Sequence, residues 1–125
     1  MKQTFKRNER LKSGQRISTV AAKGQVIKSG PISLKWIETH VEQKVALKAT
    51  VAVAKRFFKK AVDRNKIKRR MREAFRKNKN AIIGELNLKN KKLDLILFHN
   101  TDRLSLYAEI ENNVIKALEK LQEKL

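Results

Sequence analysis

The sequence contains no cysteine and no long apolar segment, and its acidic residues are few. Without cysteine the chain has no disulfides, thiolate metal sites or cysteine nucleophile, as is usual for a reducing compartment. The longest apolar runs, 49–54 and 95–98, are far shorter than the roughly 20 residues of a membrane-spanning helix. The first residues are basic and lack the apolar stretch of a secretory signal. We therefore expect a soluble, cytoplasmic protein.

The shortage of acidic residues leaves a large excess of positive charge. The 125 residues include 12 Asp and Glu against 31 Lys and Arg, which gives a formal net charge of +19. Such an excess opposes compaction by self-repulsion, so a polyanionic partner is expected, either nucleic acid or an anionic membrane. Hydrophobic residues make up 41% of the chain, enough for a modest core. We expect one domain over residues 1–125, with a basic tail over about residues 1–12.

The excess charge is concentrated in two segments. Residues 1–28 carry +7 and residues 55–79 carry +11, whereas the rest of the chain is nearly neutral. This distribution is typical of a binding surface, because charge that serves only solubility would be spread over the whole chain.

Hydrophobic periodicity predicts a small α+β fold. The expected elements are a helix capped by Ser13 and closed at Lys23, strands over 32–36 and 45–54, a helix over 64–77 with Asp63 as its N-cap, a strand over 93–98, and an amphipathic helix from about Ser105. This order, α-β-β-α-β-α, describes a small α/β sandwich. The segment 78–92 is compatible with an extension of the central helix or with a separate turn.

The central helix carries most of the basic charge. Residues 64–76 read RNKIKRRMREAFR. At 100° per residue the apolar side chains share one narrow arc that must face the core, and cations occupy both flanks. Glu73 alone interrupts the positive charge. The residues of the apolar arc are Ile67, Met71, Ala74 and Phe75.

Nucleic acid explains this helix better than a solvated surface does. Solvated helices usually mix charges, because a Glu–Lys pair contributes about 0.2–0.5 kcal/mol and like charges cost a similar amount. Arg64 and Lys66 also lie near the positive end of the helix dipole, at a further cost of about 0.3–1 kcal/mol each. Phosphate groups would offset these costs. RNA is favoured over DNA, because no helix-turn-helix, zinc-finger or heptad pattern accompanies the helix.

Segment 64–76 resembles the signature R-N-x-x-K-R-x-x-R-E-x-F of the bacterial ribonuclease P protein component. The likeness extends over essentially the whole chain, with RLK at 10–12, VAKR at 53–56, AV at 61–62 and YAEI at 107–110. A basic helix alone would be weak evidence, whereas this motif within this order of elements is specific.

The resemblance implies a left-handed β-α-β crossover, which periodicity does not reveal. It also implies a subunit of the ribonucleoprotein that removes the 5′ leader from precursor tRNA. In that family the catalytic RNA performs the hydrolysis with bound Mg²⁺, so no catalytic residues are expected in this chain. The implied partners are the catalytic ribonuclease P RNA and precursor tRNA. The resemblance indicates neither a metal site in the protein nor its oligomeric state.

The resemblance further implies which residues bind RNA. The residues expected to face the catalytic RNA are Arg64, Asn65, Lys66, Lys68, Arg69, Arg70 and Arg72, together with Lys55 and Arg56 at the strand end. The expected leader-binding face comprises Ile17 and Ala21 on the first helix and Ser33 and Lys35 on a strand. Some family members carry aromatic residues there. Because this chain does not, leader contacts should rely on charge and apolar packing; Ile17 is equally compatible with the core.

Two other functions remain as alternatives. An autonomous ribonuclease would need an acid–base pair or clustered carboxylates, and the only histidines, His40 and His99, are expected to be ordinary surface residues. A non-catalytic RNA-binding module such as a ribosomal protein has a similar composition and lacks only the motif. A membrane-surface helix is disfavoured because its apolar residues are needed in the core.

Trp36 and one of two adjacent phenylalanines are expected to pack inside. Trp36 shares a strand face with Ile32 and Leu34, so it is expected in the core rather than at a base-stacking site. One of Phe57 and Phe58 is expected beneath the central helix, and the other is free to contact RNA.

Overall fold

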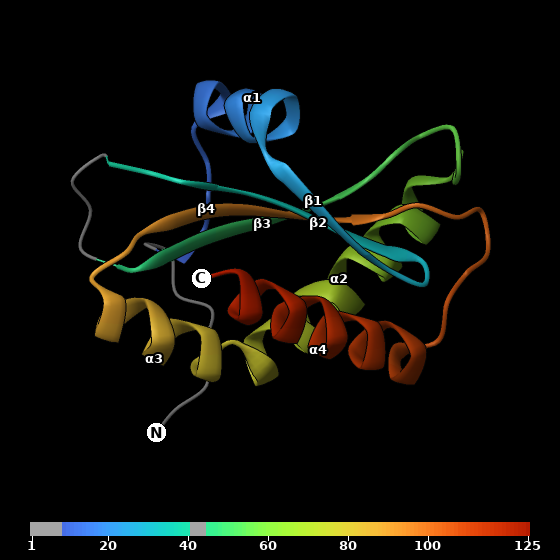
Figure 1. Cartoon of the computed structure of the whole chain (residues 1–125). Coiled ribbons are helices and arrows are strands. Elements are labelled where there is room, and N and C mark those ends of the chain that lie inside the picture. Colours follow the sequence, from blue (N-terminus) through green and yellow to red (C-terminus); the bar gives the residue numbers. More distant parts are fainter. Residues whose placement is uncertain (1–8, 41–44) are drawn as a thin grey trace.

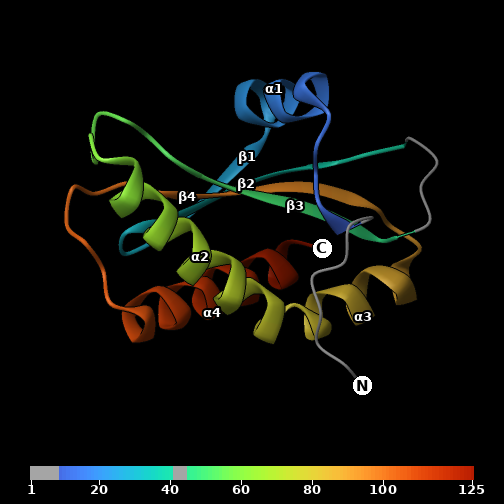
Figure 2. The same ribbon diagram turned by 180° about the vertical axis from the view of Figure 1, so that it is seen from behind.

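The computed structural model describes residues 9–40 and 45–125 and contains one mixed β-sheet. The elements are α1 (Gly14–Lys23), β1 (Gln25–Ser29), β2 (Ile32–Glu38), β3 (Leu47–Val53), α2 (Ala61–Asn78), α3 (Asn80–Lys89), β4 (Leu93–His99) and α4 (Tyr107–Lys124). The strand order is β1-β2-β4-β3, antiparallel except for the parallel pair β3 and β4. Helix α1 covers one face of the sheet, and the other three helices cover the opposite face (Figures 1 and 2).

The predicted order of helices and strands is confirmed, and two short elements are added to it. Strand β1 forms a hairpin with β2 through a turn at Gly30, whose φ of 55° is the left-handed conformation that glycine adopts readily. Helix α3 occupies the undecided segment and is separated from α2 by Lys79 alone. Helix α3 ends at Lys89, and the next residue, Asn90, adopts the left-handed conformation with a φ of 53°.

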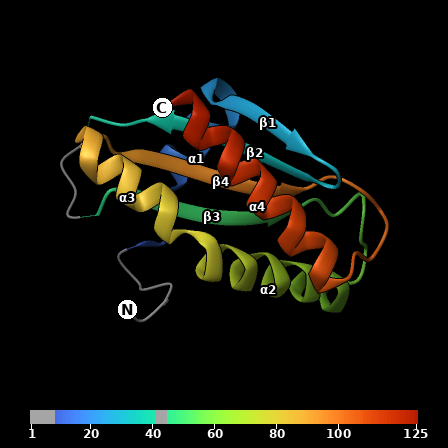
Figure 3. The same cartoon turned by 60° about the horizontal axis from the view of Figure 1, so that its bottom comes forward.

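The connection from β3 to β4 is a left-handed crossover, as the family resemblance implied. These parallel strands are neighbours, and the helices between them lie on a single face of the sheet. Figure 3 looks onto that face; when both strands are turned to point upward, β4 lies to the left of β3. Because about 98% of such connections are right-handed, this arrangement is a distinguishing feature of the fold.

The apolar stripe of α2 faces the core as predicted. Its four residues are all at most 2% exposed: Ile67, Met71, Ala74 and Phe75. The predicted N-cap is wrong, because the helix begins at Ala61 and Asp63 lies within its first turn. There its carboxylate is favourably placed near the positive end of the helix dipole.

Most of the remaining predictions for the core are confirmed. Ser13 caps α1 by accepting a hydrogen bond from the Arg16 amide at 3.4 Å, and the helix ends at Lys23. Trp36 and Phe58 are buried, whereas Phe57 is half-buried. The expected basic tail lies largely outside the described residues. Its last part runs beside β3, where the Leu11 amide donates to the Ala49 carbonyl at 2.9 Å.

A buried ion pair holds α1 against the sheet. The Arg16 Nε donates to the Asp94 carboxylate of β4 at 2.8 Å, and the Asp94 side chain is only 4% exposed. Beside this pair, Leu11 and Val20 pack on Ile96 in a small second core. Because α1 is fixed at the end of the sheet where β4 begins, the other end of this face stays open for the pocket described below.

We predict that Ile67→Ala lowers the free energy of unfolding by about 2–5 kcal/mol, because it leaves a cavity at a fully buried site. Chemical denaturation monitored by circular dichroism measures the change. Lys66→Ala, one residue away on the outer side of α2, is the control and should stay within about 0.5 kcal/mol of the wild type. Equal effects of the two substitutions would contradict the orientation of the helix.

Candidate nucleic-acid interface

The outward surface of α2 is a dense array of cations and one amide side chain, Asn65. Burial of Ile67 and Met71 turns the predicted basic residues away from the core. Within the described part of the chain, the members of this array that make no hydrogen bond or ion pair with the protein are Asn65, Lys66, Lys68, Arg69 and Arg72. Their donors are therefore available to an external anion. We call these five residues the outer face of α2.

Two other predicted residues of this helix bind the protein itself. The Arg64 Nη1 donates to the carbonyl oxygens of Phe58 and Lys59 at 2.7 and 2.9 Å. The Arg70 Nη1 donates to the Ser105 carbonyl at 2.6 Å. A guanidinium has five N–H donors, so each arginine keeps others for a second partner. No sequence pattern indicates these contacts, because backbone carbonyls carry no residue-specific signal.

The single acidic residue of the motif does not neutralise the outer face. The Glu73 carboxylate pairs with Arg76 one turn further along and lies 3.9 Å from the Lys77 ammonium group. The hydrogen bond from Arg76 holds the pKa of Glu73 below its usual value, so this carboxylate stays ionised near neutral pH. Its charge is compensated by residues beyond the outer face, and Arg69 and Arg72 keep theirs.

The loop from β3 to α2 connects this helix to a pocket on the opposite face of the sheet. The predicted strand-end cations Lys55 and Arg56 are exposed in this loop, and the Arg56 guanidinium lies 4.8 Å from the centre of the Phe57 ring. The pocket has a volume of about 430 Å³. Its lining residues are Val26, Lys28, Ser33, Lys35, Ala54, Arg56, Phe57, Phe98, His99 and Asn100.

The structure brings together part of the predicted leader-binding face. Ser33 and Lys35 line the pocket, and the Lys35 Nζ donates to the Ala21 carbonyl of α1 at 2.9 Å. Ala21 is exposed beside them. Ile17 lies apart from the pocket lining, half-buried against the second core.

Phe98 of the pocket was not predicted from the sequence, whereas Phe57 is the phenylalanine that was expected to be free to contact RNA. Phe98 is half-buried in β4 next to Ser33 of β2, and its ring centre lies 5.6 Å from the Lys35 Nζ. Phe57 comes from the loop. The signal for Phe98 was present: alternation in β4 places Asp94, Ile96 and Phe98 on the face away from α2 and α4.

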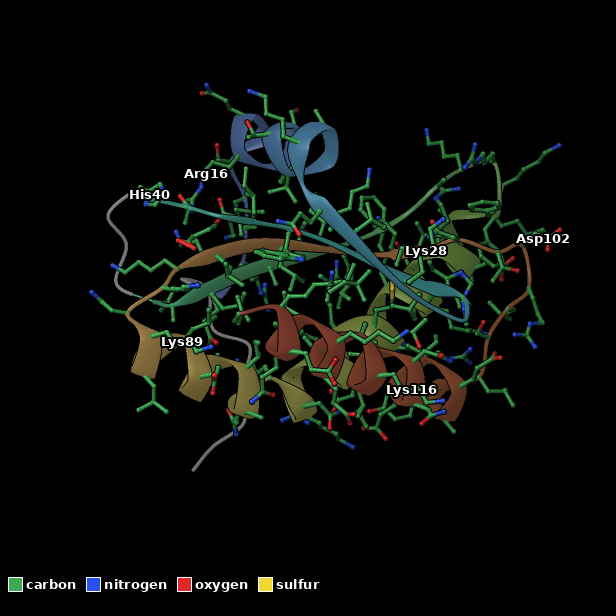
Figure 4. The ribbon with its side chains drawn as sticks, in the orientation of Figure 1. Arg16, Lys28, His40, Lys89, Asp102 and Lys116 are labelled. Atoms are coloured by element: carbon green, nitrogen blue, oxygen red, sulfur yellow. The ribbon has the colours of Figure 1, made fainter. Side chains whose placement is uncertain are left out.

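The two histidines do not form a catalytic pair. His40 follows β2 at the end of the sheet where β4 begins, near Arg16 (Figure 4), whereas His99 ends β4. The length of β4 separates these positions by about 20 Å. The expectation of a surface residue is wrong for His99, which is 1% exposed and whose pKa is lowered by burial.

Neither metal binding by the protein nor a membrane span is indicated. In residues 9–40 and 45–125, no three His, Asp or Glu side chains gather as a metal-binding group. The helices of the same ranges are too short or too polar to cross a bilayer. What these residues do offer is a cationic helix surface and a pocket with aromatic and basic walls, a combination that binds RNA phosphates and unstacked bases.

Comparisons with known proteins agree with this chemistry. A sequence model of the Ribonuclease P family matches residues 5–122. The Ribonuclease P protein component of Porphyromonas gingivalis strain W83 is 30% identical over 113 residues, covering 90% of this chain and 82% of the relative. The fold is similar to that of the Staphylococcus aureus RNase P protein (TM-score 0.71, 21% identity, 90% of this chain and 94% of that one). It is also similar to the Thermotoga maritima RNase P protein (TM-score 0.60, 24% identity, 94% and 97% covered). This chain therefore belongs to the Ribonuclease P family of proteins.

Proposed function

We propose that this protein is the accessory subunit of ribonuclease P and that it supplies binding surfaces, while the catalytic RNA cleaves the 5′ leader from precursor tRNA. The observation that carries this function is the outer face of α2, four cations and Asn65 without side-chain partners in the protein, in a chain of this family. The two histidines stand at opposite ends of the sheet, so they do not form an acid–base pair with each other.

The basic surface of α2 is the proposed contact with the catalytic RNA. Arginine binds a phosphate with two parallel hydrogen bonds, and closely spaced cations on a rigid helix follow the spacing of a folded RNA backbone. Lys55 and Arg56 extend this surface into the loop before α2. Arg64 and Arg70 contribute charge to it while holding protein carbonyls with part of their donors.

The pocket beside Phe98 is the proposed site for the 5′ leader. It lies at the carboxyl ends of β3 and β4, where open sheets commonly bind ligands. The rings of Phe98 and Phe57 offer stacking surfaces, and Lys35 and Arg56 offer charges for the backbone. Ser33 completes the floor. Ala21 of α1 lies beside the pocket, where its carbonyl accepts a hydrogen bond from Lys35, whereas Ile17 packs against the second core and lies apart from the lining.

We assign the Mg²⁺ of the reaction to the RNA subunit. The described part of the protein offers no clustered carboxylates or histidines that would hold this ion. Bound to RNA, Mg²⁺ would supply the chemistry of phosphodiester hydrolysis. The cations of α2 neutralise phosphates of the folded RNA, so the complex should need less free magnesium than the RNA alone.

Reconstitution tests the function directly. Cleavage of a precursor tRNA is measured at low magnesium with this protein alone, with a bacterial ribonuclease P RNA alone, and with both. We expect cleavage at the mature 5′ end only, or much faster, when both are present. Cleavage by the protein alone would contradict the account. No enhancement by the protein would leave a non-catalytic RNA-binding module, such as a ribosomal protein, as the better interpretation.

A single cation on the outer face of α2 should contribute about one phosphate contact. We predict that Arg69→Ala weakens binding to the catalytic RNA and reduces the slope of log K against log salt by about 0.7–0.9. Fluorescence anisotropy over a range of salt concentrations measures this slope. Lys116→Ala on the exposed surface of α4 removes the same charge elsewhere and should leave the slope nearly unchanged.

The Phe98 ring should contribute to leader affinity by stacking. We predict that Phe98→Leu, which keeps an apolar side chain, weakens binding of a precursor with a long leader by about 1–3 kcal/mol. Affinity for a precursor with a one-nucleotide leader should not change. Phe98→Tyr retains the ring and serves as the matched control. Equal losses for both precursors would place the stacked base elsewhere.

A further inference from the structure

Helix α2 holds the loop that precedes it through Arg64. The carbonyl oxygens of Phe58 and Lys59 both point to the Arg64 Nη1, at 2.7 and 2.9 Å. This loop spans residues 54–60, and one backbone hydrogen bond closes a turn within it, from the Phe57 amide to the Ala54 carbonyl at 3.1 Å. The guanidinium therefore satisfies two acceptors that the loop does not pair internally.

The same helix holds a second loop through Arg70. This loop spans residues 100–106 and connects β4 to α4. The Arg70 Nη1 donates to the carbonyl of Ser105 at 2.6 Å, and Ser105 is 1% exposed. The Ser105 hydroxyl lies 2.9 Å from the Nε2 of His99, the last residue of β4.

The two loops meet between these arginines. The rings of Phe58 and His99 face each other with centres 5.8 Å apart and an interplanar angle of 42°. The contacts thus form a closed ring that starts and ends on α2. Its members, in order, are Arg64, Phe58, His99, Ser105 and Arg70.

This closed ring of contacts adjoins the pocket beside Phe98 that is proposed to bind the 5′ leader, which we call the leader pocket. The first loop supplies Arg56 and Phe57 to the pocket lining, and the second loop supplies Asn100. His99 belongs to both the lining and the ring. A shift of either loop would displace aromatic or polar walls of the pocket, whereas the strands that carry Ser33 and Lys35 are fixed by sheet pairing.

We propose that Arg64 and Arg70 are positioning residues for the leader pocket, which they shape from the opposite side of the sheet by holding the loops 54–60 and 100–106. The inference rests on the proposed function. It assigns different roles to two groups of residues on α2. The five residues of the outer face dock the catalytic RNA. The two arginines that bind protein carbonyls determine the arrangement of the residues that receive the leader.

Paired variants test this division. Arg70→Met and Arg69→Met each remove one positive charge from neighbouring positions of α2, and Ser105→Ala breaks the contact with His99 without any change of charge. For each variant, titration of the protein measures its affinity for the catalytic RNA. At saturating protein, we then measure the ratio of precursor affinities with a long and a one-nucleotide leader.

We expect Arg70→Met and Ser105→Ala to lower the leader ratio by about five- to tenfold, as for the loss of one hydrogen bond of typical strength. Arg69→Met should lower affinity for the catalytic RNA and leave the leader ratio unchanged. Arg70→Lys, which keeps the charge and one donor, should restore part of the ratio. An unchanged ratio in both Arg70→Met and Ser105→Ala would overturn the proposal.

Hydrogen exchange provides a readout that does not depend on RNA. In the free protein, amides of residues 54–60 and 100–106 should exchange faster in Arg70→Met and Ser105→Ala than in Arg69→Met. Equal exchange in all three variants would contradict a positioning role even if one variant folded poorly. A wild-type complex that shows no leader effect at all would overturn the proposed leader pocket itself, whereas a wild-type effect that survives the variants overturns only the positioning role.

Discussion

Burial of the apolar stripe of α2 against the sheet determines where the functional charges of this protein point. Ile67 and Met71 have no solvent exposure, so the helix cannot rotate without exposing them. The adjacent cations are thereby held together on the outside, although like charges at these spacings are unfavourable in an isolated helix. Packing of the core therefore stabilises a helix whose closely spaced positive charges would destabilise it in isolation. RNA phosphates would relieve this repulsion on binding, which links the fold directly to its proposed partner.

The loop from β3 to α2 joins the two proposed binding surfaces. Strand β3 ends at Val53 and α2 begins at Ala61, so the basic loop between them lies at the carboxyl end of the sheet. The leader pocket opens at that same end, on the face that α1 leaves uncovered. Arg56 belongs to both the loop and the pocket lining. A catalytic RNA on α2 and a leader in the pocket would therefore share one continuous basic surface of the protein.

The sequence predicted the features that depend on periodicity and missed those that depend on tertiary contacts. The stripe from Ile67 to Phe75 and the cap at Ser13 follow from local spacing, and both are confirmed. Strand β1 was missed because its sequence, QVIKS, places two apolar residues side by side and does not alternate. The left-handed β-α-β crossover was predicted from the family resemblance, because the periodicity of the residues does not reveal it. The partners of Arg64 and Arg70 are backbone carbonyls, in the second case 35 positions away, and no sequence pattern marks them.

The central claim is that α2 contacts the catalytic RNA while the sheet pocket contacts the leader. The absence of cysteine allows a single reactive group to be placed at will. An iron chelate that generates hydroxyl radicals is attached at position 65 on α2 in one variant, Asn65→Cys, and at the pocket rim in another, Val26→Cys. In the complex with catalytic RNA and precursor tRNA, we predict that strand cuts from position 65 fall in the catalytic RNA and cuts from position 26 fall in the 5′ leader. The reverse pattern, or no cuts in the catalytic RNA from position 65, would contradict the account.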